Sequence, residues 1–212
     1  MQPQLIETIR FEGGKFHNLA YHQARMNKSQ KALFNTQTPI ALTTHLRPPQ
    51  LDAPIVRCRV TYGAQIEQIE YLPYTPKPIE KLKVVRAAID YPYKFANRSA
   101  LNALLAAHPD VDEVIIEKEG LLTDTTIANI ALFRDGIWYT PHTPLLEGTM
   151  RAKLLDEGKL YPAKITTDSL QTYTHLALMN AMIGFRVLNV VIDINNKERV
   201  IYDHQPTTDQ NL

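Results

Sequence analysis

The sequence of 212 residues contains only one cysteine, Cys58, and no long apolar run. A single cysteine excludes an internal disulfide framework and is typical of a reducing compartment. No apolar stretch approaches the roughly 18 residues that span a bilayer, and the start of the chain lacks the pattern of a signal peptide. The strand-like stretch V-R-C-R-V places Cys58 in the core beside Val56 and Val60. These features predict a soluble, cytoplasmic, globular protein.

The sequence also lacks an excess of charge, with 23 Lys and Arg against 22 Asp and Glu. Neither a basic surface for nucleic acid nor a charged segment for a membrane is therefore expected. The chain is long enough for a substantial core in one or two domains. Three prolines within residues 73–80 favour an extended linker. The predicted division is a small N-terminal lobe, residues 1–80, and a larger lobe, residues 81–212, that carries Lys94.

Alternating and helical patterns of apolar residues predict a mixed α+β chain with mostly antiparallel strands and few helices. Residues 5–11 are expected to form a strand that turns back at E-G-G-K, and residues 18–34 a helix with Asn18 as its cap. Further strands are expected at 55–61, 66–71, 82–90, 114–117, 128–133, 137–140, around 165, at 175–180 and at 185–192. Two further helices are expected at 99–107 and 149–156.

Two ionisable residues are candidates for chemistry. Lys94 follows a predicted strand and lies between Tyr93 and Phe95, where an amine with reduced hydration can act as a nucleophile. Taken alone, a lysine on the surface explains the same pattern. Asp124 follows two leucines and lies among hydroxyl side chains in L-L-T-D-T-T. Taken alone, it is a turn aspartate or a helix cap.

Three other places could hold an anion. Gly148 and Thr149 begin a predicted helix, with Arg151 in its first turn, and N–H groups at a helix start bind anions. Asn180 and Ala181 lie where a predicted strand ends in A-M-I-G. His22 and Arg25 share one face of the first helix. The ordinary alternatives are a hydrated helix start, a β-turn and a solvated helix face.

One cofactor requires all of these groups together. Pyridoxal phosphate needs a lysine that holds it covalently and an acid at its ring nitrogen. Its phosphate needs a cup of N–H donors and an arginine. The acid keeps the ring nitrogen protonated, so that the ring accepts electrons from a carbanion. The combination therefore predicts a pyridoxal phosphate enzyme.

The sequence resembles the class IV aminotransferases, the pyridoxal phosphate enzymes of fold type IV. The similarity begins at L-I-E-T-I-R-F-E-G-G, continues through H-Q-A-R-M-N-K-S and is densest between Lys94 and Arg151. K-F-A-N-R resembles the lysine motif of the aminodeoxychorismate lyase branch, and L-L-T-D-T-T-I-A-N-I-A-L-F the segment with the ring-nitrogen acid. L-L-E-G-T-M-R and L-A-L-M-N-A-M-I-G resemble the two phosphate-binding segments. The resemblance implies a two-lobed architecture and a homodimer.

The resemblance also implies residue roles. Lys94 corresponds to the lysine that holds the cofactor and moves protons, Asp124 to the ring-nitrogen acid, and Asn129 lies near the substrate side. The implied phosphate contacts are Arg25, Gly148, Thr149, Met150, Asn180 and Ala181. The family acid is usually glutamate, so the shorter aspartate implies either a shifted cofactor or a bridging water. The chain is also short for the family, which implies trimmed substrate loops.

The reaction implied by the resemblance is conversion of 4-amino-4-deoxychorismate to 4-aminobenzoate and pyruvate, a step of folate biosynthesis. A transaminase acting on branched-chain or D-amino acids shares every cofactor contact and stays open. A non-catalytic relative that only binds the cofactor also stays open. Whether Arg98 or Arg151 touches the substrate is not decided by the sequence, and no metal site is predicted.

Overall fold

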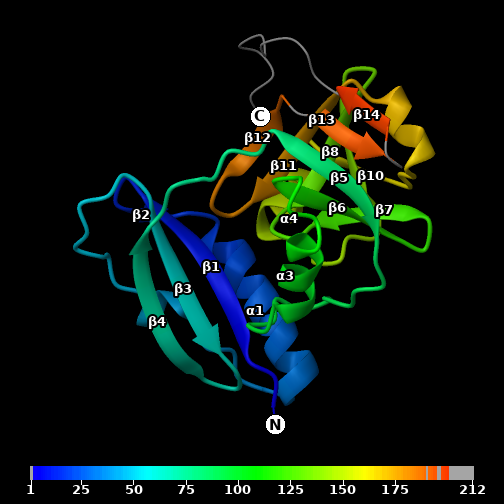
Figure 1. Cartoon of the computed structure of the whole chain (residues 1–212). Helices are drawn as coiled ribbons and strands as arrows, with labels where there is room; N and C mark the ends of the chain where they lie inside the picture. The colour runs from blue at the N-terminus through cyan, green and yellow to red at the C-terminus, as the bar shows by residue number, and fades with distance from the viewer. Residues whose placement is uncertain (1, 190, 195–196, 201–212) are drawn as a thin grey trace. The chain divides into compact units, whose positions relative to one another are not determined.

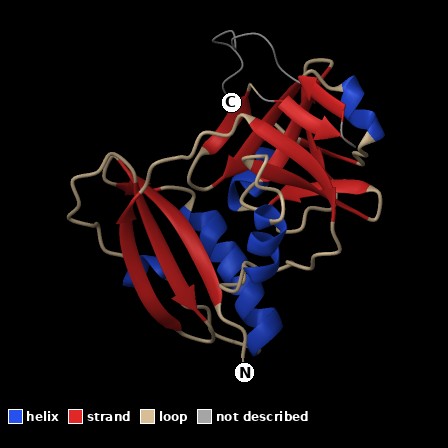
Figure 2. Ribbon diagram, viewed as in Figure 1, coloured by secondary structure: helices blue, strands red, loops and turns tan. Residues whose placement is uncertain are grey.

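The structure is a computed structural model that describes residues 2–189, 191–194 and 197–200 (Figure 1). Its contacts divide the chain into two compact units. Unit 1 comprises Met1–Pro76 and Tyr91–Asn97, and unit 2 comprises Lys77–Asp90 and Arg98–Leu212. Strands outnumber helices in the described residues, and most strand pairs are antiparallel (Figure 2). The predicted α+β class is therefore confirmed. None of the described helices is long and apolar enough to cross a membrane.

Unit 1 is an antiparallel sheet with strand order β2-β1-β3-β4 and helix α1 on one face (Figure 1). Its elements are β1 (Leu5–Glu12), β2 (Lys15–Phe16), α1 (Leu19–Phe34), α2 (Leu42–His45), β3 (Val56–Tyr62) and β4 (Ile66–Pro73). Gly13 and Gly14 have φ angles of +56° and +76° and form the predicted tight turn after β1. Asn18 is the N-cap residue of α1, as predicted, but it is in a left-handed conformation and its side chain makes no capping hydrogen bond.

The core of unit 1 follows from the alternation of β1 and β3. Leu5, Ile9 and Cys58 are fully buried on the sheet face that carries α1, where Met26 of that helix joins them. The predicted burial of Cys58 is confirmed. Because burial raises the pKa of this thiol to about 12, it behaves as a small apolar group.

The segment of residues 91–97 belongs to unit 1 because its backbone pairs with the start of β1. The amide of Ile6 donates to the carbonyl of Lys94 at 2.9 Å, and the amide of Ala96 donates to the carbonyl of Gln4 at 2.8 Å. Phe95 forms an isolated antiparallel bridge with Leu5. The sequence placed Lys94 in the lobe of residues 81–212, whereas these bonds group it with unit 1. The lobe boundary itself stays a prediction.

Unit 2 is built on a larger mixed sheet. The strand order is β10-β9-β8-β7-β6-β5-β13-β14, and β11 joins it by pairing with β8 and β12. Its elements are β5 (Lys81–Arg86), α3 (Ser99–Ala106), β6 (Glu113–Lys118), β7 (Leu121–Thr125), β8 (Asn129–Arg134), β9 (Ile137–Pro141), α4 (Thr149–Asp156), β10 (Tyr161–Ala163), a 3-10 helix η1 (Asp168–Thr172), β11 (His175–Asn180), β12 (Gly184–Leu188), β13 (Val191–Ile194) and β14 (Lys197–Val200).

Three strand predictions in unit 2 are corrected. The strand expected at 82–90 ends at Arg86, because its last partner on β6 is Glu117. Ile165 lies after β10 and outside any strand, and its apolar side chain is buried in the core instead. The strand expected at 185–192 is two strands, because β12 pairs with β11 whereas β13 pairs with β5.

Candidate active site

A buried carboxylate organises the candidate residues of unit 1. Glu7 is 0% exposed and accepts a hydrogen bond from Nδ1 of His22 at 2.6 Å. It also accepts bonds from Nε of Arg25 at 2.9 Å and from Nη2 at 2.5 Å. His22 is itself fully buried. The two helix residues therefore do not form a solvated face; both turn inward to one carboxylate.

The charges of this cluster are fixed by its burial. Burial raises the pKa of Glu7, but the charge of Arg25 and hydrogen bonds from His22 and Arg25 together lower it to about 2. Burial lowers the pKa of His22, Glu7 opposes this shift, and the positive charges of Arg25 and Lys94 lower it further. At neutral pH the cluster is thus a carboxylate, a guanidinium and a neutral imidazole. Since a carboxylate only accepts, the imidazole hydrogen is on Nδ1.

Lys94 is fixed by its neighbours rather than by a helix or a long strand. Its carbonyl is bonded to β1 one residue before Glu7, and its side chain is half-buried. The rings of Tyr93 and Phe95 meet edge to face at 6.0 Å on either side of it in sequence. The hydroxyl of Tyr91 donates to the carbonyl of Phe95 at 2.5 Å and closes the segment. This arrangement holds the lysine backbone in one conformation.

In unit 2, Asp124 lies within strand β7 and is only 4% exposed. One carboxylate oxygen accepts from Nδ2 of Asn129 at 2.8 Å, and the other accepts from the amide of Leu146 at 2.9 Å. Burial raises the pKa of Asp124 to about 7, although these hydrogen bonds and the charge of Arg151 oppose the shift. The alternatives of a turn aspartate and a helix cap do not apply, because the residue is inside a strand.

Asn129 connects this acid to the start of helix α4. Its Nδ2 also donates to the carbonyl of Leu146 at 2.8 Å, so one amide group binds both Asp124 and the loop before the helix. A Cβ placed on Gly148 would lie 1.9 Å from Oδ1 of Asn129. Glycine is therefore required at residue 148 by the approach of Asn129 rather than by its own φ angle.

Thr149 and Met150 begin α4 and are nearly buried. The first bond within the helix runs from the amide of Ala152 to the carbonyl of Gly148, at 2.9 Å. The amides of the first turn consequently point out of the helix end, as an anion site requires. Arg151 donates from Nη2 to the carbonyl of Pro141 at 2.9 Å, which fastens the helix to β9.

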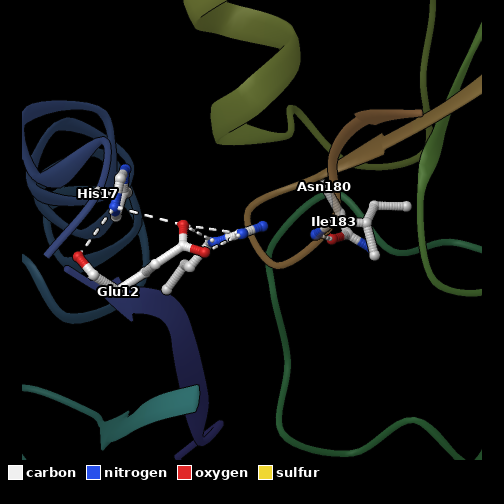
Figure 3. Close-up of polar contacts among 5 residues, drawn as sticks. Glu12, His17, Asn180 and Ile183 are labelled. Carbon is white, nitrogen blue, oxygen red and sulfur yellow. Dashed lines mark hydrogen bonds and ion pairs between the residues drawn. The ribbon is translucent and has the colours of Figure 1, made fainter. Parts of the chain in front are cut away.

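The turn of residues 180–183 between β11 and β12 is closed by its own asparagine (Figure 3). Oδ1 of Asn180 accepts from the amides of Met182 at 2.8 Å and Ile183 at 3.0 Å. Its Nδ2 donates to the carbonyl of Ile127, at 3.2 Å, in the loop that follows Asp124. Ala181 lies at the start of this turn. The asparagine thus shapes the second candidate phosphate loop and ties it to the strand of the acid.

The face of the unit 1 sheet opposite α1 carries a row of arginines, Arg10, Arg57 and Arg59. Arg10 stands directly opposite Arg57 in the β1–β3 register, and Thr8 stands opposite Arg59. Arg10 is paired with Glu12 at 2.8 Å. The Nε atoms of Arg57 and Arg59 are buried and make no hydrogen bond to any described residue. Arg59 stands opposite Glu70 of β4, so the like charges that face each other directly are Arg10 and Arg57. Such a pair is destabilising, and guanidinium groups bind anions well, so this face is suited to an anion.

Comparison with known proteins agrees with this architecture. A sequence model of the class IV aminotransferases matches residues 4–190. The chain belongs to the class IV aminotransferase family. A Haemophilus influenzae protein without a functional name is 37% identical, over 85% of this chain and 98% of that protein. A Schizosaccharomyces pombe protein provisionally named aminodeoxychorismate lyase is 29% identical, over 85% of this chain and 86% of that protein.

A solved structure from Haemophilus somnus 129pt is 35% identical and has a TM-score of 0.79, over 87% of this chain and 98% of that one. It is provisionally named 4-amino-4-deoxychorismate lyase. Class IV aminotransferases depend on pyridoxal phosphate. The two-lobed fold type IV architecture expected from the sequence is confirmed by this likeness.

The structure brings together most of the predicted residues within each unit, and it adds one that the sequence reading missed. In unit 1, Arg25 and Lys94 both lie near His22. In unit 2, Asp124 and Asn129 are bonded to each other and to the loop that leads into α4. The missed residue is Glu7. An acid alternating with Leu5 and Ile9 on the apolar face of a strand was the signal that could have found it.

Arg98 and Arg151, between which the sequence did not decide, are both bonded to backbone carbonyls of unit 2. Arg98 donates from Nη2 to the carbonyl of Thr126 at 2.7 Å, next to the carbonyl that Asn180 binds. In this class IV chain both arginines therefore have structural partners, and neither is assigned to the substrate.

Proposed function

We propose that this chain is a pyridoxal phosphate-dependent enzyme in which Lys94 holds the cofactor covalently. The observation that carries the proposal is the setting of this lysine. Its backbone is bonded to β1 next to Glu7, and its positive charge acts on His22, which shares the buried carboxylate of Glu7 with Arg25. A lysine held this firmly beside an arginine already oriented by a carboxylate fits a phosphorylated aldehyde.

The other donor groups fit the same cofactor. Each unit by itself carries donors that suit a phosphate: the outward-pointing amides of Thr149 and Met150 in unit 2, and the guanidinium of Arg25 in unit 1. The carboxylate of Asp124 accepts hydrogen bonds from Asn129 and from the amide of Leu146, and a carboxylate has about four acceptor sites. A cation beside Asp124 lowers its pKa from about 7 and favours the ionised form. Asp124 is therefore suited to a protonated ring nitrogen.

When bound, pyridoxal phosphate supplies an electron-accepting ring that stabilises negative charge on the carbon next to the substrate amine. The chain supplies the rest. Lys94 is the proposed base that takes the proton from that carbon, and the same amine returns a proton to the product. Glu7 holds the guanidinium of Arg25 by hydrogen bonds, and Asn129 binds both Asp124 and the loop that leads into α4.

The reaction we favour is conversion of 4-amino-4-deoxychorismate to 4-aminobenzoate and pyruvate. The names of the Haemophilus somnus and Schizosaccharomyces pombe relatives support this choice. The arginine row, Arg10, Arg57 and Arg59, lies on the sheet face opposite Glu7 and Arg25, so in the proposed homodimer it is available only to the substrate of the other copy, whose two carboxylates suit arginine. After Lys94 removes the proton, loss of pyruvate from the neighbouring carbon leaves an aromatic ring.

The alternative is amino transfer between an amino acid and an oxo acid, the reaction for which the family is named. Two assays on purified, cofactor-loaded protein separate the two reactions. With 4-amino-4-deoxychorismate, the lyase releases pyruvate and 4-aminobenzoate in equal amounts. With branched-chain or D-amino acids and 2-oxoglutarate, a transaminase forms glutamate. Glutamate without pyruvate contradicts the lyase, and neither product from a cofactor-loaded protein supports a non-catalytic relative.

A homodimer is the proposed assembly, on the resemblance alone, and a cytoplasmic location stays a prediction. Light scattering of the purified protein is expected to give twice the mass of the chain. A mass equal to one chain at all concentrations contradicts the dimer.

A further inference from the structure

Tyr62, the last residue of β3, has a buried hydroxyl without a hydrogen-bond partner in the described part of the chain. The side chain is 0% exposed. Tyr62 stands opposite Leu5 in the β1–β3 register, as Val60 stands opposite Glu7, so the phenol lies on the sheet face that α1 covers. A buried hydroxyl without a hydrogen-bond partner destabilises a protein, and a bound group that accepts its hydrogen removes this cost.

The groups around this hydroxyl indicate the charge of the ligand that it can bind. Burial raises the pKa of Tyr62 and Glu7 raises it further, whereas Ser29 and Arg25 lower it. The phenol therefore lies within the fields of both members of the Glu7–Arg25 pair and stays protonated as a donor. The hydroxyl of Ser29 is nearby and donates to the carbonyl of Arg25 at 3.0 Å, but it makes no hydrogen bond with the phenol oxygen of Tyr62. A protonated donor beside a fixed guanidinium is suited to an anion.

We propose that Tyr62 is a phosphate-binding residue, and that its hydroxyl donates to the same anion as Arg25. The inference rests on the proposed cofactor, whose phosphate is the anion. Glu7 holds the guanidinium by two hydrogen bonds, so the arginine meets the anion in one orientation. Tyr62 adds a neutral donor from β3 to a site whose other contacts in unit 1 come from α1.

The test is the variant Tyr62→Phe, which removes one oxygen and keeps the ring. Binding of pyridoxal phosphate and of pyridoxal, which lacks the phosphate, is measured by the absorbance of the lysine-bound cofactor. The variant is expected to bind pyridoxal phosphate about tenfold or more weakly, since the lost hydrogen bond is to a charged group. Its affinity for pyridoxal is expected to match that of the wild type. Without ligand, its urea midpoint is expected to equal or exceed that of the wild type, because an unpaired buried hydroxyl is removed.

The matched control is Tyr71→Phe in the same unit, whose hydroxyl accepts from the amide of Arg47 at 3.0 Å. That variant is expected to lose stability and to keep the wild-type affinity for pyridoxal phosphate. Equal affinities of Tyr62→Phe and wild type for pyridoxal phosphate overturn the assignment and leave the proposed function intact. So does a Tyr62→Phe protein that is less stable or fails to fold, since the hydroxyl then has a structural partner. A wild-type protein that binds no pyridoxal phosphate overturns both.

Discussion

Replacing Glu7 by Gln is expected to loosen unit 1 at the point where it holds Arg25 and His22. The carboxylate is fully buried and accepts hydrogen bonds of 2.5, 2.6 and 2.9 Å from these two residues. Glutamine has a similar shape, but it carries no charge and turns one of the two acceptor oxygens into a donor. One of the partner N–H groups then faces another donor inside the protein.

The expected loss follows from the pKa of Glu7. The pKa falls from its ordinary value of 4.5 to about 2 in the folded protein. At about 1.36 kcal/mol for each pH unit, this difference corresponds to about 3 kcal/mol of unfolding free energy. Breaking a buried ion pair by removing one partner has an effect of about 3–5 kcal/mol, which agrees in size. We therefore expect Glu7→Gln to lower the unfolding free energy by about 3 kcal/mol at pH 7.

The sign of the pH dependence is also fixed. A carboxyl whose folded pKa is lowered stabilises the protein fully above its unfolded pKa, here 4.5, and loses that contribution as pH falls through about 2. The difference in unfolding free energy between wild type and Glu7→Gln is thus expected to be largest at pH 7 and to become smaller towards pH 2. Urea unfolding is best followed by circular dichroism, because the only tryptophan, Trp138, lies in unit 2.

Glu12→Gln is the matched control on the same strand. Glu12 is paired with Arg10, but its side chain is 39% exposed, so its removal is expected to change stability by less than about 0.5 kcal/mol. Glu7→Gln should also weaken the binding of pyridoxal phosphate, whereas Glu12→Gln should not. The reasoning is refuted if the two variants lose the same stability, or if the gap for Glu7→Gln is unchanged between pH 7 and pH 2.

Three further outcomes are expected. Burial raises the pKa of Asp124 from 3.8 to about 7. The unfolding free energy of the cofactor-free protein should therefore fall by up to about 4 kcal/mol as the pH rises between these two values. Urea titrations of Asp124→Asn should no longer show this pH dependence. Gly148→Ala should lower the unfolding free energy by about 1–3 kcal/mol, because its Cβ would lie 1.9 Å from Oδ1 of Asn129. In a double-mutant cycle, Asn129→Ala should relieve part of that loss, whereas strictly additive losses would contradict the contact. Arg57→Gln should raise KM for 4-amino-4-deoxychorismate more than it lowers kcat, without changing cofactor affinity, and an unchanged KM would remove the arginine row from the substrate site.

The sequence predicted the elements that depend on local pattern. The Gly-Gly turn, the long helix α1, the helix α4 and the burial of Cys58 are all set by residues close in the chain. Strand ends were predicted less well. The expected strand 82–90 stops at Arg86, where its pairing with Glu117 of β6 ends, and the extent of pairing is a property that no local pattern carries.

Individual candidate residues were predictable, and their partners were not. Lys94 and Asp124 stood out from their flanking sequence, but nothing near Lys94 shows that its backbone joins β1, almost ninety residues earlier. The role of Glu7 depends on burial against α1, and the role of Gly148 on the approach of Asn129. A buried polar group is recognised by the contacts around it, and those contacts are made only in the folded chain.

The central claim is that pyridoxal phosphate binds covalently to Lys94. The most direct measurement is to mix the protein with the cofactor, reduce with borohydride, digest and locate the added mass in the peptide that contains Y-P-Y-K-F-A-N-R. The account predicts one modified residue, Lys94, and loss of the modification in Lys94→Ala, which should keep its fold because the contacts to β1 are made by the backbone. No modification, or one on another lysine that persists in Lys94→Ala, would contradict it.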